Sequence, residues 1–211
     1  ELLEIGSLAR HDFMIDVALT RDRRIAGVFA GNAVEAHRRG VDFVRRVMLE
    51  QMADPVDAVI TTCAGYPLDL TFYQAVKGIT AASHIVKPGG AILLFARCEE
   101  GAGAEEFSRM LLENPSSSAF LEKIRSTPVE VDQWQLEKLA LVMERLRVLF
   151  YVPGLDAQYH PTLWGPAYPT AQEAVSALFA ELPKGARVGV IPEGPYVLAK
   201  VAQSLEANSR V

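Results

Sequence analysis

The 211-residue sequence lacks several features that would assign it to a common class of protein at once. No apolar run approaches the ~20 residues that a membrane-spanning helix needs, so we expect no membrane partner. Acidic residues outnumber basic ones, and the formal net charge of −5 argues against a nucleic-acid partner. No GxGxG loop, which would cradle a nucleotide-type cofactor, occurs anywhere in the chain.

Cysteine is also scarce, and histidine shows no metal-ligand spacing. The two cysteines, Cys63 and Cys98, are interpreted as reduced thiols of a cytoplasmic protein. The four histidines are scattered over different predicted elements: His11, His37, His84 and His160. His160, in a predicted loop, is the one histidine that we single out as a candidate functional residue. The first residue is Glu, so we expect a fragment or trimmed chain, and the question of whether a removed leader preceded Glu1 stays open.

What is present indicates one α/β domain. Residues 13–20 and 25–31 predict a β-hairpin, and Asn32 can cap a helix that runs to about residue 52. From residue 57 onward, short apolar runs alternate with helical patterns. The predicted strands are 57–62, 91–96, 148–152 and 187–191. The predicted helices are 71–84, 104–112, 117–126, 132–147, 170–181 and 194–207.

This alternation predicts a mostly parallel sheet with helices on both faces and an N-terminal β-hairpin extension. We expect a single α/β domain over residues 1–211, in which 1–52 form the hairpin-plus-helix extension and 53–211 the parallel-sheet core. The sequence KPGG at 87–90 predicts a tight turn before the second strand of that core.

One connection carries more polar side chains than a turn requires. Thr61 to Gly78 reads TTCAGYPLDLTFYQAVKG and leads from a buried strand into a helix. Ligands of open α/β sheets lie beyond the carboxyl ends of the strands, and helical spacing lets Tyr73, Gln74 and Lys77 share one face. Together with the partial positive charge of the helix N-terminus, these donors suit a small anion. A capping box from Thr71 to Gln74, a solvated Lys77 and a core Tyr73 are the alternatives.

Several segments resemble the nickel-dependent lactate racemase family, specifically the C-terminal half of its members. The resemblance rests on AGYPLDLTFYQAVKG, followed by VKPGGAILLFARCEEGAG, and on the earlier DVALTRDRRIAGVFAGNAVEAHRRGVDFV. The later stretches VDQWQLEKLA and IPEGPYVLAKV also fit, so it spans nearly the whole chain. It implies that Tyr73, Gln74 and Lys77 contact the substrate and that Trp134 lies near it.

The resemblance further implies an isomerase that racemises or epimerises a small 2-hydroxy acid by reversible hydride transfer to a nickel–pincer nucleotide. In the family, the lysine that anchors the cofactor, the nickel ligand and two proton-transferring histidines belong to an N-terminal domain, and nothing in this chain matches that domain. We therefore expect a substrate-side domain that is inactive alone and has the missing N-terminal domain as its partner. Lactate, malate-like acids and sugar acids fit the motif equally well.

Two other functions compete with this interpretation. A methyltransferase-like domain that binds S-adenosylmethionine would explain VKPGGAILLF, but the loop after the first core strand has a single glycine, Gly65. A non-catalytic structural or docking domain would use Tyr73 and Lys77 as interface residues. The loop of Glu99, Glu100 and Gly101–Gly103 is expected to be solvated, because its acidic pair would repel a carboxylate.

Overall fold

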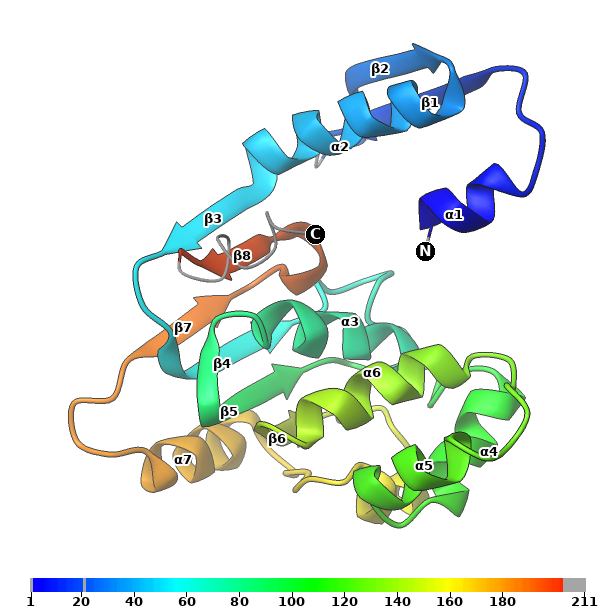
Figure 1. The fold of residues 1–211 in the computed structure, drawn as a ribbon. Helices are drawn as coiled ribbons and strands as arrows, with labels where there is room; N and C mark the ends of the chain where they lie inside the picture. Colours follow the sequence, from blue (N-terminus) through cyan, green and yellow to red (C-terminus); the bar gives the residue numbers. More distant parts are fainter. Residues whose placement is uncertain (1, 21, 203–211) are drawn as a thin grey trace. The chain divides into compact units, whose positions relative to one another are not determined.

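The computed structural model describes residues 2–20 and 22–202, and the chain divides into two compact units (Figure 1). The first unit comprises residues 1–49 and the second residues 50–211. In the described part of the chain, no helix is both long and apolar enough to cross a membrane. The expectation of one domain with a 1–52 extension stays a prediction.

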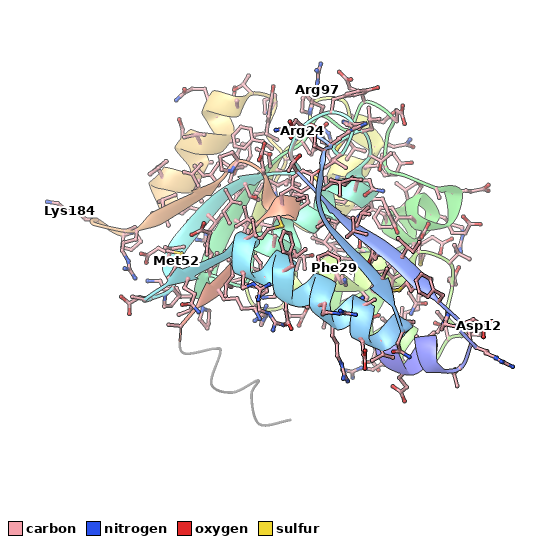
Figure 2. The ribbon with its side chains drawn as sticks, turned by 90° about the horizontal axis from the view of Figure 1, so that it is seen from above. Asp12, Arg24, Phe29, Met52, Arg97 and Lys184 are labelled. Carbon is pink, nitrogen blue, oxygen red and sulfur yellow. The ribbon has the colours of Figure 1, made fainter. Side chains whose placement is uncertain are left out.

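The first unit is a hairpin with a helix along one of its faces. It contains α1 (Leu2–Ser7), β1 (Met14–Leu19), β2 (Ile25–Gly31) and α2 (Ala33–Met48). The two strands pair antiparallel, as predicted, and the Asn32 side chain accepts hydrogen bonds from the first turn of α2. Phe29, labelled on the hairpin in Figure 2, contacts Phe43 of α2, and their ring centroids are 5.6 Å apart.

The helix of the first unit is shorter than predicted. It ends at Met48, and the next residues form the strand β3 (Leu49–Met52), which pairs with β8 (Leu198–Val201) near the other end of the chain. The prediction of a helix to residue 52 was therefore wrong at its end. A partner strand about 150 residues away satisfies this backbone, and local sequence carries no signal of such a partner.

The second unit is built on a four-stranded parallel sheet in the order β6-β5-β4-β7. Its strands are β4 (Val56–Thr62), β5 (Val86–Phe95), β6 (Arg147–Tyr151) and β7 (Val188–Ile191). Most side chains of β4, β5 and β6 are buried, which is typical of strands covered on both faces. The predicted parallel sheet is confirmed.

Helices cover both faces of this sheet. Alternate side chains of each strand point to opposite faces, so apolar side chains on both faces need a covering layer. The helices of the unit are α3 (Phe72–Ala82), α4 (Glu105–Glu113), α5 (Ser117–Ile124), α6 (Gln133–Met143) and α7 (Ala171–Glu181). Ile92 and Leu94 pack in the core that α3 and α6 share, whereas Leu93 packs with Leu178 of α7. Two 3₁₀ segments, η1 (Ala157–Thr162) and η2 (Gly194–Tyr196), complete the unit.

Two predicted elements differ from the structure. Residues 87–90 lie within β5 as an irregular stretch, where the pairing with β4 shifts, and do not form a separate turn. A Cβ atom on Gly90 would lie 2.5 Å from the Asp57 carbonyl oxygen, so glycine permits this close strand contact. The helix predicted over 194–207 is also wrong. Residues 194–196 form η2 and Leu198–Val201 form β8, while 203–207 lie outside the described residues.

Candidate functional site

The connection from β4 to α3 positions the predicted site residues. Ala64 and Gly65 both adopt positive φ, which turns the chain away from the sheet. Thr71 ends the connection as the N-cap of α3, and its hydroxyl accepts a hydrogen bond from the Gln74 amide at 3.4 Å. The helix therefore begins where the sequence predicted, with Tyr73 and Gln74 in its first turn.

The N-terminus of α3 is covered by the loop that follows β5. The amide of Phe72 donates to the Gly101 carbonyl at 3.0 Å, and the amide of Tyr73 donates to the Ala102 carbonyl at 2.9 Å. Together with the Thr71 cap, these bonds occupy the amides that an anion would contact at a free helix end. These amides are therefore not free to bind an anion directly, and the expected contribution of the helix partial charge stays a prediction. Glu99 and Glu100 of the covering loop are exposed, as expected for a solvated acidic pair, whereas Ala102 of the same loop is buried.

Gln74 and Lys77 form a hydrogen-bonded pair on the surface of α3. The Lys77 ammonium donates to the Gln74 side-chain oxygen at 2.6 Å. The side chain of Gln74 therefore orients the ammonium, and only the Thr71 half of the alternative capping box is formed. Because the amide oxygen is neutral, this contact holds Lys77 in place without neutralising its charge.

Tyr73 packs between two aromatic rings. Its ring meets Phe107 of α4 and Trp134 of α6 edge to face, with centroids 5.3 and 6.1 Å away. The buried Gln135 amide donates to the Tyr73 carbonyl at 2.7 Å, which ties α6 to α3. Burial raises the pKa of Tyr73, and the nearby Asp132 carboxylate raises it further, so the phenol stays protonated at neutral pH.

A groove of about 370 Å³ runs along α3, between α6 and the segment of η2 and β8. Lys77 and Trp134 both line it, and the Trp134 side chain is 48% exposed. Tyr73 and Gln74 are not among its lining residues, but the Tyr73 ring contacts Trp134 and the Gln74 side chain accepts a hydrogen bond from Lys77. The structure thus brings two of the four predicted residues to one groove, with the other two supporting them.

Two further residues, Lys138 and His84, line the same groove, and the sequence interpretation assigned neither of them to the site. The Lys138 ammonium lies 4.8 Å from the centroid of the Trp134 ring, a cation–π contact, one helical turn after Trp134. The i, i+4 spacing of Trp134 and Lys138 was the available signal. His84 lines the other end of the groove. Among the described residues, those lining the groove include no carboxylate, so it favours anions.

A second, smaller hollow lies at the ends of the parallel strands, where the topology rule placed the site. It has a volume of about 200 Å³, and Thr62, Phe95 and Tyr151 line it from the carboxyl ends of three adjacent strands. Asp69 also lines it and is almost fully buried, accepting a hydrogen bond from the Arg97 amide. None of the four predicted site residues lines this hollow, so they lie beside the sheet edge rather than over it.

The described residues offer neither a metal centre nor an activated thiol. They contain no group of three or more His, Cys, Asp or Glu side chains that could hold a metal ion. His160 lies in η1 and is not among the residues that line the groove. Both cysteines are buried and free, and burial raises the pKa of Cys63 to about 11 and that of Cys98 to about 12. Both thiols are therefore protonated and weakly reactive at neutral pH.

Comparison with known proteins connects this geometry to a family. The family model described as the lactate racemase C-terminal domain matches residues 51–199. The lactate racemase of Lactiplantibacillus plantarum is 35% identical over 203 residues, which cover 95% of this chain and 48% of that protein. The lactate racemase of Thermoanaerobacterium thermosaccharolyticum is 30% identical over 203 residues, covering 95% of this chain and 47% of that protein.

Solved structures agree with these matches. The structure of the lactate racemase apoprotein from Thermoanaerobacterium thermosaccharolyticum superposes with a TM-score of 0.85 at 29% identity, over 94% of this chain and 48% of that one. A crystal structure from Thermotoga maritima reaches a TM-score of 0.59 at 9% identity, over 90% of this chain and 49% of that one, and shares the fold alone. The chain spans about half the length of the curated relatives that it matches.

Proposed function

Because the chain belongs to the lactate racemase family, as its C-terminal domain, we propose that it forms the substrate-binding side of a 2-hydroxy-acid racemase or epimerase. The supporting observation is that Lys77 of α3 and Trp134 of α6 line one groove. These residues are 57 positions apart in the sequence, and each was predicted to lie near a substrate.

In this proposal, Lys77 binds the carboxylate of the acid. Its ammonium is held by the neutral Gln74 oxygen, so it reaches a ligand with its charge intact and part of its orientation already fixed. Trp134 provides an apolar wall for the carbon skeleton, and Tyr73 holds the Trp134 ring from behind. Lys138, against the same ring, places a second positive charge near the ligand.

The nickel–pincer nucleotide implied by the family resemblance has no preformed metal centre here, since the described residues include no group of three or more His, Cys, Asp or Glu side chains that could hold a metal ion. We assign that cofactor, and the reversible hydride transfer it would support, to the half of the enzyme outside the match. This chain then contributes binding and orientation of the acid. It is expected to be inactive alone and to need that other half as its partner.

Titration of the chain with D- and L-lactate, followed by amide chemical shifts, tests the binding role. A charge-assisted hydrogen bond contributes about 1.5–3 kcal/mol, so Lys77→Ala should weaken binding roughly 10- to 100-fold. Lys184→Ala, which removes an exposed lysine from the loop between α7 and β7, is the matched control and should bind as the wild type does. Equal binding by Lys77→Ala and the wild type would exclude the assignment.

An assembly role without substrate contact is the second proposal. It is favoured by the exposed position of Lys77 and by the chain's match to only half of its relatives' length. A null titration with lactate and malate, combined with loss of association with the other half in the Lys77→Ala variant, would support this role over substrate binding.

A further inference from the structure

The first unit has very little core of its own. In the described parts of residues 1–49, Ala36 is the one fully buried residue. A two-stranded hairpin is marginally stable in water unless another layer covers it. In this unit α2 covers one face of the hairpin, where Phe29 packs against Phe43 and a Cβ atom on Gly40 would lie 3.2 Å from the Phe29 ring.

The opposite face of the hairpin is aliphatic and exposed. The register pairs Val17 with Val28 and Leu19 with Ile25 across the two strands, and Ile15 follows the same alternation. These five side chains, which we call the outer face, are between 43% and 68% exposed. A contiguous aliphatic surface of this kind marks an interaction site, and it lacks the polar groups needed to orient a small ligand.

The comparisons show that the first unit is shared with longer relatives but lies outside the matched family model. The C-terminal-domain family model begins at residue 51, and the compact second unit begins at residue 50. The lactate racemases nevertheless match 95% of this chain, so the shared sequence includes most of residues 1–49. Residues 1–49 thus have counterparts in the relatives, which are about twice as long as the match, but lie outside the range that the C-terminal-domain model matches on this chain.

We propose that residues 1–49 are part of the preceding domain of the longer enzyme and that the outer face packs into the core of that domain. The hairpin and α2 would then be its last layer, and the boundary between the domains would fall at residues 49–50. This proposal does not depend on which acid the groove binds.

The decisive experiment compares two polypeptides: this chain, and the polypeptide of family length that contains it. The double variant Val17→Asp/Val28→Asp places two charges on the outer face. In the longer polypeptide these charges would be buried, and the melting temperature should fall by about 10 °C or more, or soluble protein should be lost. In this chain alone, the same variant should leave melting of the second unit unchanged, because the outer face is exposed to water.

A matched control and a second measurement cover the case in which the variant fails to fold. Val129→Asp, at an 86%-exposed valine of the second unit, should be neutral in both polypeptides. Hydroxyl-radical labelling of the unmodified proteins should oxidise Ile15 and Val28 at least several-fold less in the longer polypeptide. Equal labelling in both, or a dimer of this chain that the double variant dissociates, would overturn the proposal.

Discussion

The two units of the chain bury their residues very differently. In the second unit, β4, β5 and β6 lie between α7 on one face and α3 with α6 on the other, and nearly all of the buried core belongs to this unit. In the first unit a hairpin is covered on one face, and its apolar residues remain largely exposed. Closely packed neighbours resist changes in side-chain volume, whereas a sparse layer can adjust to them. The difference predicts separate stabilities for two regions of one chain.

Truncation of a core aromatic gives the largest contrast. Phe150 is fully buried and packs against Phe72, so Phe150→Ala should cost about 3–5 kcal/mol of unfolding free energy. Both tryptophans lie in the second unit, so tryptophan fluorescence during urea unfolding reports on that unit alone. Phe29→Ala, in the first unit, should leave the midpoint of the fluorescence transition unchanged. Its effect should appear only in the unfolding curve followed by circular dichroism. A shifted fluorescence midpoint in Phe29→Ala would show that the units unfold together.

Two helical glycines provide a matched pair with a smaller effect. A Cβ atom on Gly78 of α3 would lie 2.7 Å from the Thr62 carbonyl oxygen, so Gly78→Ala should cost about 1–3 kcal/mol. On Gly40 of α2 the nearest atom belongs to the Phe29 ring, which can move, and alanine gains about 1 kcal/mol of helix propensity. Gly40→Ala should therefore be neutral or stabilising by thermal unfolding. Similar losses of stability in both variants would contradict the inferred difference in packing between the units.

Helix caps test whether local interactions also differ between the units. Thr71 caps α3 and Asn32 caps α2, each through a side-chain oxygen that accepts hydrogen bonds from backbone amides. Since a cap acts within one turn, Thr71→Ala and Asn32→Ala should each cost about 1 kcal/mol. Thr71→Ala should appear in the fluorescence transition and Asn32→Ala only in circular dichroism. A loss several times larger at Thr71 would show that the covering loop at 101–102 depends on this cap.

The smallest expected effect concerns pH. Protein atoms packed around the imidazole partly exclude water and lower the pKa of His84, although the residue as a whole is exposed, and Lys200 and Arg145 lower it further, so the folded state favours the neutral imidazole. The unfolded chain therefore binds a proton more readily, and stability falls as pH drops below the ordinary value of 6.5. His84→Gln should flatten this dependence in the fluorescence transition between pH 7 and 5. His37→Gln, in the first unit, is the control and should leave that curve unchanged.

Local patterns predicted most of the fold correctly. The alternation from residue 57 onward, the hairpin and the caps at Asn32 and Thr71 all depend on signals within a few residues. The errors share one physical origin, which is contact between distant segments. β3 and β8 exist because they pair with each other, and the bend within β5 depends on a close approach of Gly90 to Asp57.

The site was less accessible from sequence than the fold. Helical spacing placed Tyr73, Gln74 and Lys77 on one face, but Trp134 joined them only through resemblance to a family. No spacing rule shows that Tyr73 would lie behind Trp134, or that the loop at 101–102 would cover the start of α3. These facts depend on how α6 and that loop pack against α3, and tertiary packing sets such details.

The bond from Gln135 to the Tyr73 carbonyl has a consequence for how the groove accommodates its contents. Moving α6 away from α3 would separate the buried Gln135 amide from the part-buried Tyr73 carbonyl and leave each without this partner, which is costly. The spacing between α3 and α6 is consequently set when the chain folds and not when a ligand binds. Under the proposed function, discrimination by size would be built into the scaffold, and an acid too wide for the gap would be rejected whatever its charge.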